Sequence, residues 1–172
     1  MEDLRMTCME CGRQMKTKRQ NYKYDACGLH GITLIDVEVS RCAECGEEEV
    51  AIENIEGLHR AIALAIVRKR EKLAGEEIRF LRKYLGLSGG DFAEHIGVSP
   101  ETVSRWEQDR TPMGVTADRF LRWLIVTREP VSDYPLDMLK GMAHEKPKRL
   151  KVGMKSDEGG WHPTRDRELQ PA

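Results

Sequence analysis

Two cysteine pairs of the same spacing, CMEC at Cys8 and Cys11 and CAEC at Cys42 and Cys45, constrain this chain more than any other feature. Four thiolates can surround a Zn²⁺ ion tetrahedrally at about 2.3 Å, and a two-residue spacer lets each pair wrap one side of the ion. Glycine follows both pairs and tolerates the positive φ of a chain that turns back on its metal. The spacing therefore predicts a structural zinc site on these four cysteines.

Two further candidate ligands, Cys27 and His30, lie between the pairs in the sequence ACGLHG. Either one, in place of one of the four cysteines, gives a competing ligand set. Both fall in a predicted hairpin turn, where packing or exposure is more common than metal binding. A catalytic zinc keeps an open coordination position, which four cysteines do not leave. A thioredoxin-like redox pair needs a helix start in a βαβ setting, and the sequence shows none.

The N-terminal region, residues 1–47, contains all five cysteines and short alternating segments. So short a region buries too little apolar surface to fold unaided, and a structural zinc worth roughly 10 to 16 kcal/mol in apparent binding supplies the missing stability. ITLIDVEV at 32–39 alternates and predicts a strand with Ile35, Val37 and Val39 on its apolar face. QNYKYD at 20–25 is its expected partner, with Gly28 and Gly31 in the turn between them.

From residue 48 the hydrophobic period becomes helical. Residues 48–73 predict a linker helix, and residues 74–142 predict a helical domain of four short helices with a last turn at 133–142. Residues 143–172 are rich in charge, Pro and Gly, so we expect a disordered tail. The expected fold is a two-domain protein, in which a linker helix joins a small zinc-bound β-rich domain to an all-α domain.

The segment LSGGDFAEHIGVSPETVSRWEQDRTP at 87–112 has the spacing of two short helices that cross at a tight glycine turn. Ser99 can cap the second helix, and Pro100 occupies its first position. With Val103 and Trp106 turned inward, the first turns of this helix point outward, as in a helix that reads the major groove. The pattern predicts a DNA-binding helix-turn-helix.

The outward side chains of this helix are the candidate DNA contacts. Arg105 can make a bidentate contact to guanine, and Glu101 can accept from cytosine N4. Phosphate contacts, which position a protein without specifying sequence, suit the flanking residues. The full candidate set is Ser99, Glu101, Thr102, Arg105, Gln108 and Arg110.

Charge supports this prediction only locally. The net charge of −1 gives no evidence of nucleic-acid binding, but residues 68–83 contain seven Lys or Arg against three Glu. Such a basic face can anchor phosphates on a molecule that is neutral as a whole. The alternative is a small helical bundle with a solvated basic face that binds no DNA.

These motifs together carry a family resemblance. The C-terminal part resembles the phage Cro and repressor (XRE-type) helix-turn-helix family, and residues 8 to 128 resemble the MqsA antitoxin family, which joins a YgiT-type zinc finger to such a domain. The resemblance rests on CMECG, CAECG, YKYDACGLHGITL and EIRFLRKYLGLSGGDFAEHIGVSPETVSRWEQ. It implies a zinc ion on the four cysteines of the two pairs and a DNA-reading helix at 99–108.

The resemblance also implies dimerisation through the C-terminal domain and a structural ion pair between Arg82 and Glu107. Two positions depart from the family pattern. Gly89 stands where the repressors commonly have a glutamine that touches the DNA backbone. Glu101 stands where the MqsA antitoxin has a DNA-reading asparagine, so its operator sequence does not transfer to this chain.

The expected function is a sequence-specific repressor that binds a palindromic operator as a homodimer. Its finer form is the antitoxin of a type II toxin-antitoxin system, which represses its own operon and neutralises a toxin protein through the zinc domain. The alternative is a stand-alone zinc-containing regulator with no toxin partner. We expect no enzymatic activity, because the sequence shows no catalytic triad, nucleotide-binding loop or carboxylate pair.

The expected location is the cytoplasm, with no membrane partner. The longest apolar run, AIALAIV at 61–67, is too short for a bilayer that needs about 20 residues. The first residues, MEDLRMTC, contain no apolar segment of signal-peptide type. In a reducing compartment, cysteine pairs indicate metal sites before disulfides.

Overall fold

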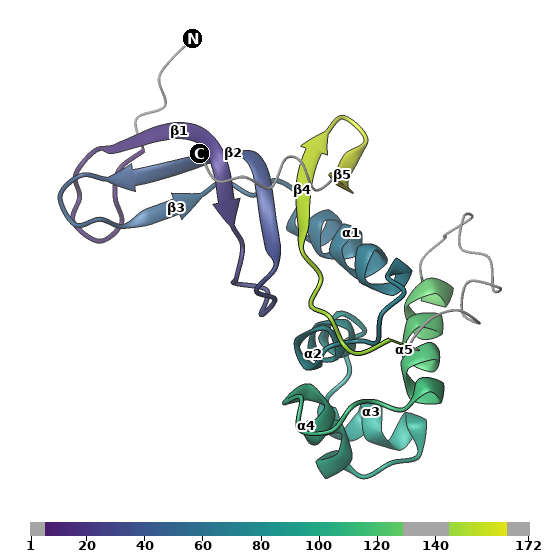
Figure 1. Cartoon of the computed structure of the whole chain (residues 1–172). Coiled ribbons are helices and arrows are strands. Elements are labelled where there is room, and N and C mark those ends of the chain that lie inside the picture. The colour runs from purple at the N-terminus through teal and green to yellow at the C-terminus, as the bar shows by residue number, and fades with distance from the viewer. Residues whose placement is uncertain (1–5, 129–144, 165–172) are drawn as a thin grey trace.

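A computed structural model of the chain describes residues 6–128 and 145–164 (Figure 1). A β-sheet at one end is followed by a helical region, which confirms the predicted two-domain architecture. The elements in chain order are β1 (Met15–Lys23), β2 (Ile32–Cys42), β3 (Glu48–Val50), α1 (Ile55–Arg68), α2 (Gly75–Tyr84), α3 (Gly89–Ile96), α4 (Pro100–Glu107), α5 (Val115–Arg128), β4 (Val152–Asp157) and β5 (Gly160–Pro163).

Strand β2 organises the sheet. It pairs antiparallel with β1 along most of its length and with β3 near its end, and β4 lies parallel to its beginning. The sheet order is β1-β2-β4-β5, with β3 as an additional partner of β2. The predicted hairpin of residues 20–25 and 32–39 therefore forms, although both strands are longer than predicted.

The alternation of β2 is broken by a bulge. The register passes from Gln20 opposite Val37 to Tyr22 opposite Leu34, so β2 has one more residue than β1 here. Asp36 adopts φ 54°, and its amide donates to the Asn21 side chain at 3.2 Å.

The bulge shifts the pattern of buried residues in β2 by one. Ile32 and Leu34 are buried before it, and Val37 and Val39 are buried after it. The three residues of the predicted apolar face, Ile35, Val37 and Val39, are buried. The burial of Ile32 and Leu34 was not predicted, because a strict alternation does not allow for an extra residue.

The linker differs from the predicted helix at both ends. Residues 48–50 form β3, and α1 begins only at Ile55 and ends at Arg68. Asn54 sets the start, because its side chain accepts from the Gly57 amide at 2.9 Å. The buried face of α1 consists of Leu58, Ile62, Ala63, Ile66 and Val67.

Helices α2 to α5 form the predicted helical domain. Ser88 caps α3 in a reciprocal box: its Oγ accepts from the Asp91 amide, and its own amide donates to the Asp91 carboxylate at 3.0 Å. Ser99 caps α4, and Gly97 ends α3 with φ 69°. The turn predicted at 133–142 lies outside the described residues.

The expectation of a disordered tail is corrected for residues 152–163, which form β4 and β5. Val152 and Met154 of β4 are buried in the apolar core. Gly31 allows the approach, because a Cβ there would lie 1.8 Å from the carbonyl oxygen of Leu150. Gly31 therefore lets the tail pack closely on the sheet, whereas Gly28, with φ 84°, allows the hairpin turn.

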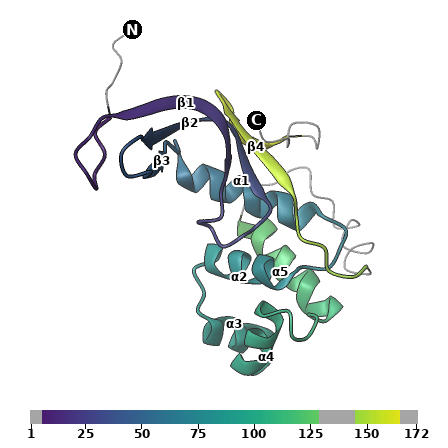
Figure 2. The same ribbon diagram turned by 60° about the vertical axis from the view of Figure 1, so that its left-hand side comes forward.

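The two domains share their apolar interior. Figure 2 shows α1 between the sheet and the other helices, with β4 running up beside them. Buried residues from the sheet, α1, the helical domain and β4 form one continuous cluster, which includes Leu34, Ile62, Leu81, Phe92 and Met154. Among the residues that the structure describes, a second cluster at the far end of the sheet consists of Cys8, Met15 and Cys42.

Candidate metal centre and DNA-binding surface

The four paired cysteines converge at the end of the sheet that lies away from the helices. Their sulfur atoms all lie within 4.8 Å of one another. The Sγ atoms of Cys8 and Cys45 are 3.5 Å apart, and those of Cys11 and Cys42 are 3.4 Å apart. Contacts therefore run between the two pairs, as a single shared ion requires.

Each pair belongs to a tight turn of the same form. The Gly12 amide donates to the Cys8 carbonyl at 2.9 Å, and the Gly46 amide donates to the Cys42 carbonyl at 3.1 Å. Both glycines have positive φ, 70° and 78°. The glycine after each pair thus closes a turn that an L-side chain disfavours.

The thiols of the cluster do not ionise independently. Backbone amides of Cys45 and Glu44 lower the pKa of Cys42 to about 7. The Glu47 amide lowers the pKa of Cys45, but the thiols of Cys8 and Cys42 outweigh this effect and raise that pKa to about 12. A bound cation would favour the ionised form of all four thiols together. Four soft thiolates are a donor set that suits Zn²⁺.

Cys27 and His30 occupy different surroundings. The Cys27 thiol donates to the Tyr24 carbonyl at 3.6 Å, and burial raises its pKa. His30 Nδ1 lies 2.7 Å from the Glu76 carboxylate at the start of α2. Among the described residues, neither belongs to the group of four thiols. His30 instead joins the hairpin turn of the sheet to the helical domain.

The candidate recognition helix is α4. Its N-terminus is capped by Ser99, whose Oγ accepts from the Thr102 amide at 3.3 Å. Val103 and Trp106 are buried, whereas Glu101 and Arg105 are exposed, and Thr102 is half-buried. The first turns of α4 therefore present polar side chains outward while the opposite face packs on the domain.

The crossing of α3 and α4 is fixed by the glycine turn between them. Gly97 takes a left-handed conformation, and the Val98 amide donates to the Ala93 carbonyl at 3.0 Å. Phe92 and Ala93 are both buried on the side of α3 that faces the core. This local geometry is that of a helix-turn-helix unit.

Helix α2 holds the other end of α4. Arg82 Nε donates to Glu107 Oε1 at 2.5 Å, and both side chains are nearly buried. Arg79, which sequence reasoning missed, donates to the Glu107 carboxylate at 3.2 Å and to its carbonyl at 3.0 Å. Its spacing of three residues from Arg82 on one helix face was the available signal.

Gly75 brings the start of α2 close to the end of α4. A Cβ on Gly75 would lie 2.7 Å from the carbonyl oxygens of Trp106 and Glu107. Its amide donates to Asp109 Oδ1 at 2.7 Å. The recognition helix is thus clamped at its C-terminal end by backbone contact as well as by charge.

The remaining predicted contacts follow α4. Gln108 is exposed, and its side-chain amide donates to Ser104 Oγ at 2.8 Å. Arg110 is exposed, and its backbone amide donates to the Arg105 carbonyl at 2.9 Å. The structure thus brings Arg105, Gln108 and Arg110 to one end of α4, while Ser99 lies at the other.

Sequence reasoning also missed Arg122, a fully buried arginine of α5. Its guanidinium donates to the Asp118 carboxylate at 2.6 Å and to the carbonyls of Val67, Lys69 and Glu71 at 3.1, 2.6 and 2.7 Å. The spacing of Asp118 and Arg122 indicates an ion pair but not its burial. This arginine ties α5 to the end of α1.

Comparison with known families supports the helical domain. Residues 73–132 match the family model described as "Helix-turn-helix domain". Comparisons with curated proteins and with solved structures gave no match to the chain. Within the described residues, each helix falls short of the length or apolarity of a membrane span. The matched domain and the four-cysteine cluster fit an XRE-type helix-turn-helix protein, and the domain supports a DNA-binding transcriptional regulator.

Proposed function

We propose that this chain is a sequence-specific transcriptional repressor that binds a palindromic operator as a homodimer. The observation that carries the proposal is α4, a capped helix whose outer face is exposed while Val103 and Trp106 anchor its inner face. A helix held in this way can enter the major groove. In a symmetric dimer, two such helices meet half-sites separated by about one helical turn, roughly 34 Å.

The residues of α4 then take separate roles. Arg105 contacts a guanine edge, Glu101 accepts from cytosine N4, and Thr102 contacts the neighbouring base or phosphate. Ser99, Gln108 and Arg110 contact phosphates and set the register of the protein on the duplex. Glu107 is excluded from base reading because its carboxylate already accepts from Arg79 and Arg82.

Zn²⁺ has a structural role in this proposal. Cys8, Cys11, Cys42 and Cys45 would hold it, and no coordination position remains for a substrate. The ion would supply the stability that the small cluster of buried residues around it does not provide. We assign the chain no enzymatic activity and place its action in the cytoplasm.

Gel-shift titration with the gene's own upstream region tests the repressor function. We expect Arg105→Ala to cost about 1 to 3 kcal/mol and to relax specificity at one base pair. Arg110→Ala should weaken binding to all sequences alike and reduce the salt slope by about one. Absence of binding by the wild-type protein would overturn the function, and an unaffected Arg105→Ala variant would overturn the assignment of α4.

The finer proposal is an antitoxin of a type II toxin-antitoxin system that represses its own operon and binds the toxin through the zinc domain. Support comes from the combination of a four-cysteine sheet and a helix-turn-helix, which resembles the MqsA family. The alternative is a stand-alone regulator. A small basic open reading frame that overlaps this gene, and whose product co-purifies with the chain, favours the antitoxin; a lone gene favours the regulator.

A further inference from the structure

The tail reaches the sheet along a fixed path over the helical domain. We call residues 146–151 the basic tail segment. The Lys148 carbonyl accepts from Lys69 Nζ at 2.7 Å, and the Leu150 amide donates to Glu77 Oε1 at 3.0 Å. Directly after the segment, the Val152 amide donates to the Gly31 carbonyl at 3.0 Å. Contacts of its own backbone atoms, and of the backbone directly after it, therefore hold the segment in place.

Glu77 is the main anchor of this path. Its side chain is fully buried, and besides Leu150 it accepts from the Ala74 amide at 2.7 Å and pairs with Lys69. A buried carboxylate with three donors is costly to leave unsatisfied. The hydrogen bond from the Leu150 amide to Glu77 therefore contributes to the fold of the helical domain rather than being an incidental surface contact.

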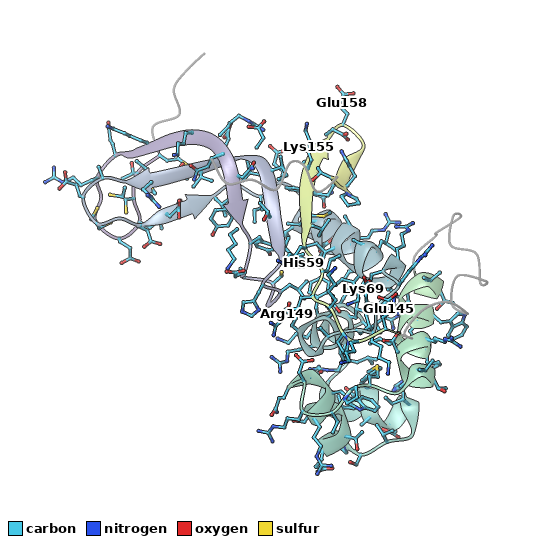
Figure 3. The ribbon with its side chains drawn as sticks, viewed as in Figure 1. His59, Lys69, Glu145, Arg149, Lys155 and Glu158 are labelled. Carbon is cyan, nitrogen blue, oxygen red and sulfur yellow. The ribbon has the colours of Figure 1, made fainter. Side chains whose placement is uncertain are left out.

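The basic tail segment lies beside the chain that follows the recognition helix. One groove is lined by Lys146, Lys148 and Arg149 from the tail and by Asp109, Thr111 and Pro112 from the segment after α4. Arg149 also lies 4.0 Å from the Asp109 carboxylate and 3.4 Å from that of Glu76. Figure 3 shows Arg149 at the level of α2, close to the helix-turn-helix.

The charge of this segment is exposed and mostly uncompensated. Lys146, Lys148, Arg149 and Lys151 are all exposed. Within the described residues, only Arg149 of these four forms a salt bridge. The three lysines line the same groove as Trp106 and Asp109 at the end of α4 and give it a local positive charge, although the chain as a whole carries a net charge of −1.

We propose that the basic tail segment contacts the phosphate backbone of the DNA that α4 reads, an inference that rests on the proposed DNA-binding function. The major groove is about 12 Å wide, so a phosphate strand borders the recognition helix on each side. Basic side chains next to the C-terminal end of α4 face one of these strands. Contacts of this kind add affinity without adding sequence specificity.

The test is the triple substitution Lys146→Gln, Lys148→Gln and Lys151→Gln in the full chain, measured by fluorescence anisotropy on the gene's upstream duplex and on a scrambled duplex. We expect weaker binding to both duplexes by the same factor. The slope of log affinity against log salt should become shallower by about 0.9 for each phosphate that the variant no longer neutralises. Unchanged thermal unfolding would show that the tail remains folded, because the anchoring atoms of the tail are backbone atoms.

A charge-matched control is Lys16→Gln, Lys18→Gln and Lys155→Gln, three exposed lysines of the sheet. In Figure 3, Lys155 lies on β4, on the far side of α1 from the helix-turn-helix. An equal loss of affinity in the control would overturn the inference, because it would indicate a general effect of charge. An unaltered salt slope in the tail variant would also overturn it. If Arg105→Ala still weakens binding in that case, the proposed function stands without the tail.

Discussion

The cysteine end of the sheet and the helix-turn-helix domain are held together by different means. Around the four cysteines, the only buried apolar cluster consists, among the described residues, of Cys8, Met15 and Cys42. The helical domain instead packs a continuous core and adds helix caps, a buried arginine and an ion pair. The first region would therefore depend on the proposed metal ion, whereas the second depends on many weaker interactions.

This difference predicts how far the effect of a substitution or of metal removal should extend. The sheet and helices share one core through β2 and α1, but the cysteine cluster lies outside that core. Removal of the proposed metal should therefore act on the far end of the sheet, whereas a substitution in the core of the helical domain should lower the stability of the whole chain.

The largest expected effect is removal of the metal. Cys42→Ser should abolish zinc binding, whose apparent free energy is roughly 10 to 16 kcal/mol for a structural site. Hydrogen exchange should accelerate at the amides of Gly12 and Gly46, which close the two cysteine turns, while the helical circular dichroism stays near the wild-type value. Cys27→Ser, outside the cluster, should retain one zinc per chain. Zinc loss from that control would show that the ligand set is wrong.

A large effect on the helical domain is expected for Arg122→Met. The substitution leaves the Asp118 carboxylate and three backbone carbonyls without their buried donor. Breaking a buried pair by removing one partner costs about 3 to 5 kcal/mol, and urea unfolding should report this as a lower midpoint. Arg128→Met, at an exposed position of the same helix, should cost much less; equal costs would contradict the anchoring role of Arg122.

A smaller effect is expected from a single helix cap. Ser88→Ala removes the Oγ that accepts from the Asp91 amide at 3.1 Å, and removal of such a cap costs about 1 kcal/mol. Thermal unfolding should detect it, with Ser156→Ala at an exposed position of β4 as the control. A Ser88→Ala protein as stable as the control would weaken the view that the domain is stabilised by many small contributions.

The smallest expected effect is a pH dependence at the junction of sheet and helices. His59 Nε2 lies 2.9 Å from the Tyr24 hydroxyl, and burial lowers the pKa of His59 below its ordinary value. Because the unfolded chain then binds more protons than the folded one, stability should fall as the pH drops from about 7 to about 5. The difference in unfolding free energy between wild type and His59→Gln should shrink over this range, and a constant difference would exclude the effect.

Short-range sequence patterns predicted much of the structure of this protein. The two CxxC pairs with their glycines predicted the cluster of four cysteines, and the sequence from 87 to 112 predicted the cap of the second helix and the glycine turn, but not the Ser88 cap of the first. The cysteine turns, the cap and the glycine turn are local, because a few neighbouring residues fix them. The approach of the two cysteine pairs, with Cys8 and Cys45 lying 37 residues apart, was inferred instead from the chemistry of a shared ion. The family match over residues 73–132 agrees with that part of the prediction.

The other features described above, the β2 bulge, the buried arginine and the ordered tail, depend on tertiary contacts. The bulge at Asp36 depends on the register against β1, the burial of Arg122 depends on the end of α1, and the order of the tail depends on Glu77 and Gly31. In each case the partner lies far away in the sequence. A polar composition suggested a disordered tail, but a few buried side chains, such as Met154 in the shared core, accompany the two strands that part of it forms. Composition measures the average of a segment, whereas folding depends on where its few apolar and hydrogen-bonding groups find partners.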